Sequence, residues 1–526
     1  MTISRRHDTL ESINDWMTAL PNFHQNKSHR PTIVSKQSEV LQGNVIINNS
    51  EKHDKKTSWR SIYLLTAICM FCGVQFSIYF PSLWPFLNTV DPTASDVFFG
   101  IITASYSVGQ GIASPLFGLW MNRSKSVRSP LIVGITVMIL SNTIFCFVEA
   151  FMEKKRRWVM LVSRLFIGLG AGTVGVMRAY AATASTLTDR ARAITLIQAS
   201  YVIGMTIGPA IPVAFAPIQY PGWVVGPLHV DMYTASAWLA SIICIVSLIL
   251  LLIMLEENYA GIEEKYEDDY NPLPTFDVLG VSICVITQFT MMFIITNLET
   301  VGSMYAMVMW SWTKRQAVIY IGILQAINGI FSMFLYAAFV GKLGDCMSKG
   351  RERIFTMIGL AMALLYHVLT FPFPIGPTLR WTTKVVSHNV TYVGCNPNQY
   401  KWCHSVHRVN LWLYAVLYCT LLASCFPIVT ISMNTLFSKI LGARRQGTMQ
   451  GVMLMSGSLA RTFGPLLVSV LFQLYGPEPV WGIEIATLTI TLILWMLFYR
   501  HLVPLRIPDL SSGEYMKYPN GIKYRL

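Results

Sequence analysis

Charged side chains are scarce in this chain. Only 13% of its 526 residues are Asp, Glu, Lys or Arg, whereas 53% are hydrophobic. A soluble domain of this size needs more polar surface than such a composition supplies. The apolar residues also run in stretches of about 20, the length of helix that crosses a hydrocarbon core of about 30 Å. The composition therefore excludes a soluble globular protein and indicates a polytopic membrane protein.

Sequence features of many enzymes are also missing. The chain has no glycine-rich phosphate-binding loop, and no spacing of cysteine and histidine suggests a zinc site. We therefore expect no metal, no cofactor and no enzymatic activity, so that an ion gradient or the solute's own gradient would drive any transport. Residues 1–60 are polar, without the apolar core of a cleavable signal peptide. We expect them to form a mostly disordered tail, and 501–526 to form a second cytosolic tail.

The apolar stretches divide the chain into two sets of six. The predicted spans are 61–86, 97–120, 129–150, 158–182, 193–217, 233–255, 276–299, 317–340, 354–375, 409–433, 448–472 and 480–500. Apolar character continues past Glu299, so span seven is either longer or broken near Gly302. An acidic linker at 256–275 separates an N-terminal half, 61–255, from a C-terminal half, 276–500.

Lysines and arginines are distributed unequally over the loops. Most lie in the tails and in the loops on one side of the predicted bundle, which favours both termini in the cytosol. The run from Lys154 to Arg157 contradicts this bias, because it falls in a short loop on the other side. The net charge of +13 thus reflects topology and does not indicate a nucleic-acid partner.

One long loop, 376–408, is predicted on the non-cytosolic side. It carries the sequon NVT at Asn389, which can be glycosylated there. It also carries Cys395 and Cys403, which either close a small disulfide in an oxidising lumen or remain two free thiols.

Two polar corners embedded in apolar sequence resemble each other. GLWMNRSKSVR runs from Gly118 to Arg128 between spans two and three, and GKLGDCMSKGRER runs from Gly341 to Arg353 between spans eight and nine. A second echo joins SYVIGMTIGP in span five to SGSLARTFGP in span eleven. Two echoes in matching order indicate an internal repeat of six spans.

The corners resemble the signature of the major facilitator superfamily, in which a glycine is followed four residues later by an acid and then by basic residues. The positions that fit are Gly341, Asp345, Arg351 and Arg353 in the second corner, and Gly118, Arg123 and Arg128 in the first. Asn122 stands where the first corner would have its acid. The residues that match the helix-packing patterns of the family, or repeat them, are Gly168, Gly172, Gly204, Gly208, Pro209, Gly464 and Pro465.

The resemblance implies an all-α fold of two six-helix halves around a central cavity, surrounded by membrane lipid. We expect a monomer that binds a small molecule or an ion. The segments SRLFIGLGAG and SKILGARRQG are similar to the endolysosomal branch whose loss in humans causes the seventh form of neuronal ceroid lipofuscinosis. That likeness implies a lysosomal or endosomal membrane. Because the branch's acidic dileucine sorting signal is not evident in this tail, the plasma membrane is the alternative.

Charged side chains inside the predicted spans are candidates for a solute pathway. A charge near mid-membrane costs at least about 2.5–3.5 kcal/mol on insertion scales, so it is usually functional or paired. Arg461 and Arg164 each share a helix face with glycines, so both are expected to face protein or a cavity. Each arginine either contacts solute or serves a structural role. Glu299 either takes a proton in a coupled carrier or pairs with an arginine.

Other ionisable residues are interpreted as structural. Arg178, near the cytosolic end of span four, is expected to snorkel or to pair at a gate. Glu149 and Glu484 are expected to be solvated at helix ends. His367 is alone in span nine, and we interpret it as a core histidine and not as a proton relay.

The two corners are predicted to form a cytosolic gate. Its residues are Gly118, Asn122, Arg123, Gly341, Asp345 and Arg351. Asp345 is predicted at the C-terminal end of helix eight, where the helix dipole disfavours an acid. It would therefore need a basic partner, and we expect it to latch the halves together in the outward-open state.

The leading functional prediction is a secondary active transporter that moves a small solute by alternating access. The mid-membrane arginine favours an anion. One alternative is a channel-like pathway for anions, chloride above all. A second alternative is a membrane scaffold or sensor that transports nothing.

Overall fold

The computed structural model describes most of the helical region. The described ranges are 56–260 and 275–505, apart from 81, 95, 187, 219, 226–227, 376, 387–388 and 398–399, together with three short strands. These strands, β1 (Ile33–Val34), β6 (Tyr515–Lys517) and β7 (Lys523–Arg525), form one antiparallel sheet in the order β1-β6-β7. They belong to a small unit of Met1–Ser50, Glu264–Leu273 and Ile507–Leu526. The larger unit, Glu51–Glu263 with Pro274–Arg506, holds every helix given below. Nearly all of the predicted tails and most of the predicted linker lie outside the described residues.

The first half of the larger unit makes six passages. Its helices are α2 (Trp59–Ser77), α3 (Leu83–Val90), α4 (Asp96–Ser124), α5 (Arg128–Cys146), α6 (Glu153–Ala171), α7 (Thr173–Thr183), α8 (Arg190–Ile207), α9 (Ile211–Phe215) and α10 (Thr234–Met254). Short 3-10 turns lie at η2 (Val148–Ala150), η3 (Gly208–Ala210) and η4 (Ala216–Ile218). α6 and α7 form one passage that is interrupted at Gly172.

The second half makes six more passages. Its helices are α11 (Val278–Trp310), α12 (Lys314–Val340), α13 (Lys342–Ser348), α14 (Glu352–Leu369), α15 (Leu411–Leu417), α16 (Ala423–Leu441), α17 (Gly447–Tyr475) and α18 (Pro477–Leu497). A π-helix, η7 (Tyr418–Leu422), joins α15 to α16, so that the three form one passage. The predicted all-α fold of twelve passages in two halves is thus confirmed.

Spans one and seven differ from the helices that form, and short interruptions also divide span four at Gly172 and span five at η3. Span one breaks, because α2 ends at Ser77 and α3 begins only at Leu83. The sequence has Pro81 in this gap, and proline cannot continue the helical hydrogen-bond ladder. Span seven is one unbroken helix of 33 residues that continues through Gly302 to Trp310. A single glycine costs a helix only about 1 kcal/mol, which packing along α11 outweighs.

Side-chain caps fix the starts of several passages. The Asp277 carboxylate accepts hydrogen bonds from the backbone N–H groups of Leu279 and Gly280, and so begins α11. Thr313 and Gln316 form a reciprocal capping box at the start of α12. Such caps satisfy N–H groups that have no partner inside the helix.

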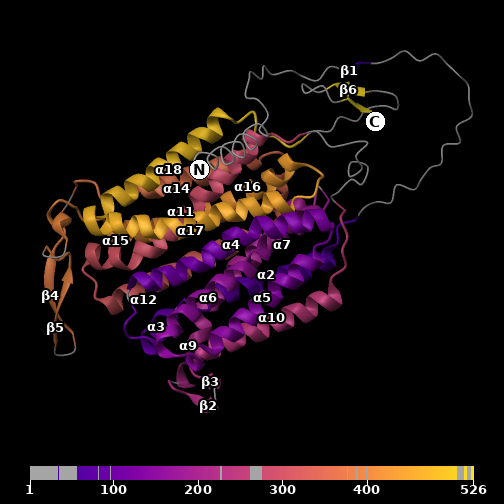
Figure 1. Ribbon diagram of the computed structural model, residues 1–526. Coiled ribbons are helices and arrows are strands. Elements are labelled where there is room, and N and C mark those ends of the chain that lie inside the picture. The colour runs from indigo at the N-terminus through magenta and orange to yellow at the C-terminus, as the bar shows by residue number, and fades with distance from the viewer. Residues whose placement is uncertain are drawn as a thin grey trace, which may run out of the picture. The chain divides into compact units, whose positions relative to one another are not determined.

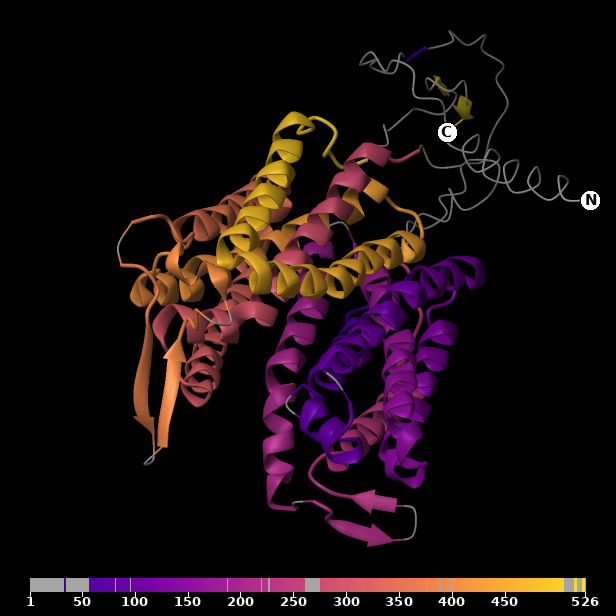
Figure 2. The same ribbon diagram turned by 60° about the vertical axis from the view of Figure 1, so that its left-hand side comes forward.

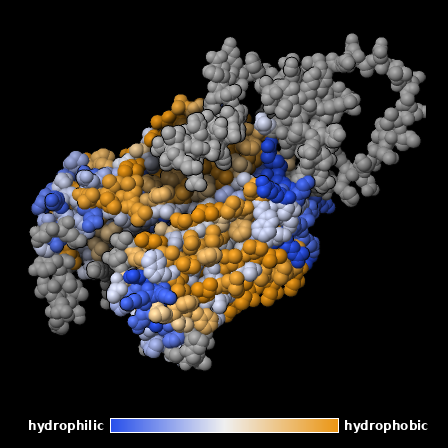
Figure 3. Space-filling view, viewed as in Figure 1, coloured by the Kyte–Doolittle hydropathy of each residue, from blue (hydrophilic) through white to orange (hydrophobic). Residues whose placement is uncertain are grey.

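Within the part of the chain that the structure describes, eleven helical passages are long and apolar enough to span a membrane. The twelfth, α4, is 29 residues long but is not among the eleven. It buries Ser105, Ser107, Gln110 and Ser114, and it packs against α6 and α17. These side chains lower the hydropathy of α4 because they are polar. The helix tolerates them because they face protein neighbours and not lipid. Figure 3 shows apolar side chains over the helices and hydrophilic side chains gathered at their ends.

The helical bundle has two ends. We call the end where α2 begins and α18 finishes the terminal side, and the opposite end the hairpin side (Figure 1). The first hairpin pairs β2 (Trp223–Val225) with β3 (Leu228–Val230). The second pairs β4 (Trp381–Val386) with β5 (Asn389–Gly394). Both hairpins therefore project from the hairpin side, opposite the end where α2 begins and α18 finishes.

The second hairpin is tied to the helices that follow it. Cys395, directly after β5, forms a disulfide with Cys403 in the 3-10 turn η6 (Lys401–His404). Trp402 packs on Gly476, where an added Cβ would lie 2.7 Å from the indole ring. Asn389 is the first residue of β5 and pairs with Val386 of β4.

The glycines singled out from the sequence lie where helices touch. A Cβ on Gly204 would lie 2.1 Å from the carbonyl oxygen of Met70 on α2, and a Cβ on Gly168 would lie 2.1 Å from that of Tyr106 on α4. A Cβ on Gly172 would lie 2.8 Å from the Ala113 side chain, and a Cβ on Gly208 would lie 2.0 Å from the Ser77 hydroxyl. A Cβ on Gly464 would lie 2.6 Å from the Asn297 side chain. Pro209 lies in η3, which ends the α8 passage, and Pro465 lies inside α17.

Close contacts between the two halves gather towards the terminal side. α4 of the first half crosses α17 of the second, and a Cβ on Gly118 would lie 2.1 Å from the Gly447 carbonyl oxygen. α8 packs against α12, α13 and α16. A small apolar cluster joins Ala191 of α8 to Tyr336 and Phe339 of α12. Figure 2 shows the halves as two groups of helices, indigo to magenta and salmon to yellow, and these contacts close them together on the terminal side.

Candidate solute pathway

Arg461 lies at the midpoint of its helix. It is the fifteenth of the 29 residues of α17, and Gln110 is the fifteenth of the 29 residues of α4. Arg461 Nη2 donates hydrogen bonds to Gln110 Oε1 and to Ser458 Oγ, the latter at 3.3 Å. Its Nε is buried without a hydrogen-bond partner among the described residues. Arg461 thus has only neutral hydrogen-bond partners among the described residues.

Arg164 on α6 is more completely enclosed. Only 1% of the residue is exposed, and its guanidinium lies 4.8 Å from the ring centroid of Tyr79 and 5.1 Å from that of Tyr106. Aromatic rings attract a cation to their faces. Arg164 Nε and Nη1 are buried, and Arg164 makes no hydrogen bond or ion pair with any described residue. The two tyrosines therefore hold a cation whose buried Nε and Nη1 have no acceptor among the described residues.

Glu299 is an acid on which Arg461 acts electrostatically. It lies on α11, and its side chain is exposed although the residue stands inside a membrane-length helix. Arg461 is the charged group that acts on its carboxylate. Arg461 therefore acts electrostatically on Glu299, whereas Arg164 lies beyond the rings of Phe76 and Tyr106, whose centroids are 4.8 Å apart.

Arg178 on α7 also belongs to this region. It interacts electrostatically with Arg461 and with the hydroxyls of Tyr201 and Tyr336, and Tyr336 comes from the other half. Its Nε is buried and has no hydrogen-bond partner among the described residues. Snorkelling or pairing at a gate, expected for Arg178, stays a prediction.

The first polar corner lies at the contact between α4 and α17. Asn122 Oδ1 accepts a hydrogen bond from the Gly447 N–H at 2.9 Å, and Asn122 Nδ2 donates one to Thr448 Oγ1 at 2.9 Å. Gly118 lies one turn earlier against Gly447. Asn122 thus caps the first turn of a helix in the other half, while Arg123 is exposed.

The second corner differs from its prediction. α12 ends at Val340, Gly341 interrupts the helix, and Asp345 lies in the first turn of the separate helix α13. The helix dipole favours an acid in a first turn, so the argument that Asp345 is placed unfavourably is wrong. Arg351 Nη1 donates to Cys346 Sγ at 3.3 Å. A latch at Asp345 stays a prediction that rests on the repeat and on the packing of α13 against α8.

Comparison with known proteins agrees with this architecture. The family model described as Major Facilitator Superfamily matches residues 64–398. The chain belongs to the major facilitator superfamily. Members of this superfamily are transporters, and this chain is a multi-pass membrane protein.

The chain is also similar to individual superfamily proteins. It is 31% identical to major facilitator superfamily domain-containing protein 8 of Xenopus laevis over 481 residues, covering 85% of this chain and 92% of that one. It is 22% identical to multidrug resistance protein 2 of Bacillus subtilis, covering 59% and 72%.

Solved structures share the fold at low identity. The human organic anion transporter MFSD10 (TETRAN) has a TM-score of 0.60 at 14% identity, covering 83% of this chain and 99% of that one. The proton:xylose symporter XylE has a TM-score of 0.60 at 14% identity, covering 84% and 96%. These likenesses establish the architecture. The nature of the solute has to be inferred from the residues of this chain.

The first corner lacks the superfamily acid but has another carboxylate close by. Glu257, at the start of the linker, accepts hydrogen bonds from Ser126 Oγ at 2.7 Å and from the N–H groups of Val127 at 3.2 Å and Arg128 at 2.9 Å. Burial acts to raise the pKa of Glu257, but these hydrogen bonds outweigh burial and lower it. The sequence analysis placed Glu257 in the acidic linker and missed this contact.

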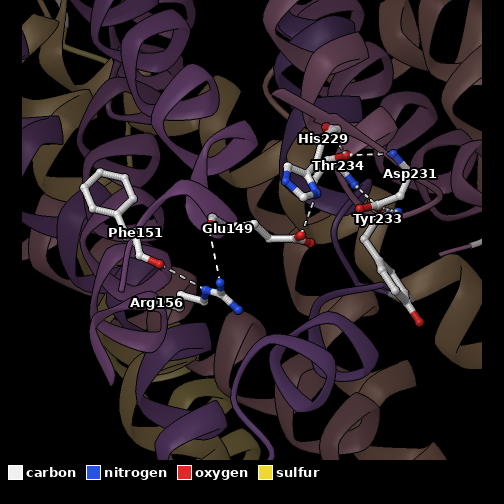
Figure 4. A network of polar contacts seen from close by, with 7 residues as sticks. All are labelled: Glu149, Phe151, Arg156, His229, Asp231, Tyr233 and Thr234. Atoms are coloured by element: carbon white, nitrogen blue, oxygen red, sulfur yellow. Dashed lines mark hydrogen bonds and ion pairs between the residues drawn. The ribbon is translucent and has the colours of Figure 1, made fainter. Parts of the chain in front are cut away.

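A polar cluster lies on the hairpin side of the first half (Figure 4). Glu149 Oε2 lies 2.8 Å from His229 Nδ1, and Arg156 Nη2 donates to the Glu149 carbonyl oxygen at 3.1 Å. Asp231 Oδ1 accepts hydrogen bonds from two backbone N–H groups at the start of α10. The predicted solvation of Glu149 is wrong, because its side chain is only 5% exposed. Burial raises the pKa of Glu149. The charges of His229 and Arg156 oppose this rise in pKa, and the charge of Asp231 adds to it.

This cluster predicts a pH dependence of stability. Because the pKa of Glu149 is raised in the folded chain, the folded state binds a proton more tightly than the unfolded state. The contribution of protonated Glu149 to folding stability is fully present below the ordinary glutamate pKa. It is lost as the pH rises through the raised pKa of the folded chain. We expect Glu149→Gln to flatten the fall in melting temperature over that window, measured in detergent. Glu153→Gln, at an exposed site on α6, is the control. Identical pH profiles for Glu149→Gln and the wild type would contradict the assignment.

His367 and Glu484 also depart from their predictions. His367 Nε2 lies 3.1 Å from Glu484 Oε2, and both side chains are 0% exposed. His367 is therefore not alone, and Glu484 is not solvated. Sequence reasoning also did not single out Tyr79 and Tyr106, because the chain has 23 tyrosines and no spacing marks these two.

Proposed function

We propose that this protein is a secondary transporter that carries a small anion through the bundle by alternating access. The observation that carries the proposal is Arg164, a guanidinium at 1% exposure whose N–H groups find no acceptor among the described residues. A buried charge without a partner is costly, so such a site favours binding of an anion that supplies the missing acceptor.

The charge balance of the pathway supports an anion. Arg164, Arg178 and Arg461 bring three positive charges to this region, and Glu299 is the acid that acts on Arg461. Within the described ranges, Arg461 itself donates hydrogen bonds only to neutral oxygens. A solute anion would therefore enter a region that is positive overall.

The contacts between halves support a carrier. Gly118, Asn122 and Gly447 hold the terminal side closed, and we propose that these contacts, with Gly341, Asp345 and Arg351 in the second corner, open when the solute is released there. Rocking of two rigid halves around a central site is the superfamily's structural basis for such a cycle.

The orientation and compartment are also proposals. The bias of lysine and arginine supports a cytosolic terminal side, and the sequence resemblance supports an endolysosomal membrane. The disulfide between Cys395 and Cys403 lies on the hairpin side and fits an oxidising lumen. If the hairpin side is lumenal, Asn389→Gln should remove a glycosidase-sensitive shift in mass from the protein expressed in cells. A shift that survives the substitution would contradict glycosylation at Asn389.

Transport itself is tested with the purified chain in liposomes. Chloride, inorganic phosphate and small mono- and dicarboxylates are supplied outside, and their uptake is measured with and without the same anion inside. A carrier gives saturable uptake that is accelerated by internal anion. Conductance far above carrier turnover would replace the proposal with a channel, and absence of flux for every anion would favour a scaffold or sensor.

A further inference from the structure

Four consecutive basic residues, Lys154 to Arg157, lie in the first turns of α6 on the hairpin side. Two features make this position unfavourable for them. The bias of lysine and arginine assigns few basic residues to this side of the bundle. The start of a helix is also the positive end of the helix dipole, which disfavours cations. The run therefore requires negative charge or acceptor groups that offset it.

The two arginines of the run turn back onto the protein. Arg156 Nε donates a hydrogen bond to the Phe151 carbonyl oxygen, and Arg156 Nη2 donates one to the Glu149 carbonyl oxygen, each at 3.1 Å (Figure 4). Arg157 Nε lies 3.7 Å from Asp91 Oδ2, and the Asp91 side chain is only 9% exposed. Both guanidinium groups therefore have oxygen atoms of the protein beside them.

The two lysines of the run have no such partners. Lys154 and Lys155 are exposed, and their side chains make no hydrogen bond or ion pair with any described residue. Glu153 before them and Asp91 beside Arg157 balance two of the four positive charges. Two positive charges therefore remain without compensation at the start of α6.

Lys154 lies at the end of an apolar stripe along α6. Trp158, Val162 and Phe166 follow it at intervals of four residues, so they share one face of the helix, and they are 52%, 44% and 45% exposed. Arg164 is buried, and it points to the side nearly opposite Phe166, because two residues turn an α-helix by about 200°. Since α6 belongs to a passage of membrane length, the stripe faces lipid.

Lys154 and Lys155 lie at the level of the lipid headgroups. Tryptophan is enriched at the interface between membrane and water, and Trp158 is one helical turn deeper along the stripe than Lys154. Phe151 and Met152, directly before α6, are 42% and 71% exposed and extend the apolar surface to the helix start. Lysine side chains near a helix end extend their amines to the interface. The amines therefore lie beside headgroups, while the apolar side chains lie beside acyl chains.

We propose that Lys154 and Lys155 bind the phosphate of an anionic phospholipid in the hairpin-side leaflet. An acyl chain of this lipid lies along the apolar stripe of α6. A free anion would use only the two amines, whereas a phospholipid uses the amines and the stripe together. A zwitterionic lipid carries its own cation and leaves the excess positive charge in place. The inference does not depend on the proposed transport, and its consequence is that a bound lipid holds the start of α6 at a fixed depth in the bilayer.

The site is tested by hydrogen–deuterium exchange of the full chain in nanodiscs of phosphatidylcholine, with and without phosphatidylglycerol. Phosphatidylglycerol should slow exchange of the backbone amides of 151–157 in the wild type and not in the double variant Lys154→Gln/Lys155→Gln. The affinity of that variant for phosphatidylglycerol, measured by native mass spectrometry, should be about 30-fold lower than that of the wild type. Each basic residue beside an anionic surface contributes about fivefold to such an affinity.

A second double variant, Lys401→Gln/Arg408→Gln, is the matched control. It removes two exposed basic residues from the hairpin side, outside the stripe, and should keep the wild-type slowing. No slowing in the wild type, or equal slowing in the wild type and Lys154→Gln/Lys155→Gln, would overturn the site. Inorganic phosphate added to phosphatidylcholine nanodiscs should leave exchange at 151–157 unchanged. Slowing by phosphate alone would show a site for a free anion and overturn the assignment to a lipid.

Discussion

Replacing Arg164 with methionine should reduce anion uptake about 30-fold or more. Truncating one partner of a buried charge pair costs about 2 kcal/mol or more, and each 1.4 kcal/mol is a factor of ten. The same substitution should leave the melting temperature of the anion-free protein unchanged or raise it. The reason is that Arg164 has no hydrogen-bond acceptor among the described residues, so the variant loses an uncompensated buried charge. Uptake of a labelled anion and thermal unfolding in detergent measure the two effects.

Two further variants separate a solute contact from a general effect of charge. Arg164→Lys keeps a cation between the rings of Tyr79 and Tyr106 but loses the planar fork of donors, so its uptake should be intermediate. Arg408→Ala removes an exposed arginine and should behave as the wild type. A structural role for Arg164 would give the opposite pattern, with a lowered melting temperature and uptake reduced only in proportion to the amount of folded protein.

Replacing Gly118 with leucine should strongly depopulate the conformation described above. An added Cβ would lie 2.1 Å from the Gly447 carbonyl oxygen, and a backbone atom cannot move aside as a flexible side chain can. Overpacking of this kind costs about 1–3 kcal/mol, which changes a two-state ratio by about 5- to 150-fold. Spin labels on the terminal ends of α4 and α17 should report longer distances in this variant than in the wild type.

The same helix offers a matched control. Gly100 also lies on α4, but an added Cβ there would meet no atom within 4 Å. Gly100→Leu should therefore keep the wild-type distances and the wild-type anion uptake. Equal distances in Gly118→Leu and Gly100→Leu would show that the contact between Gly118 and Gly447 does not hold the terminal side closed.

The sequence carried enough information for the architecture because membrane helices leave a one-dimensional signal. Apolar length located each passage, and the pair of polar corners placed the repeat without any knowledge of tertiary contacts. A charge inside an apolar run is equally visible, which is why Arg164, Arg461 and Glu299 could be singled out. The basic run at 154–157 contradicted the predicted orientation of the termini only because the prediction counts the lysines and arginines on each side. In the folded chain it forms the first turn of α6, where Arg156 binds two backbone carbonyl oxygens.

The partners of these charges could not be predicted, because each partner lies on a helix distant in the chain. His367 was taken as isolated since nothing in span nine could pair with it, and Glu484 reaches it from span twelve. Asp345 was assigned to the wrong end of a helix, because the end of α12 at Val340 falls inside a polar corner where hydropathy gives no boundary. Tyr79 and Tyr106 were missed for the same reason, since stacking on Arg164 requires the turn after α2 to meet α4 and α6.

The position of Gln110 and Arg461 at the midpoints of two crossing helices has a mechanical consequence. When two rigid bodies rock about an axis near the bilayer centre, a point is displaced in proportion to its distance from that axis. The hydrogen bond between Gln110 and Arg461 therefore lies at the fulcrum, where displacement is smallest. Gly118 and Gly447 lie about 12 Å farther along the lever arm of α4, eight residues at 1.5 Å each. In the alternating-access cycle proposed above, the arginine side chain would keep its neutral partner throughout the stroke, while the glycine contact would separate and the two halves would exchange the side on which they meet.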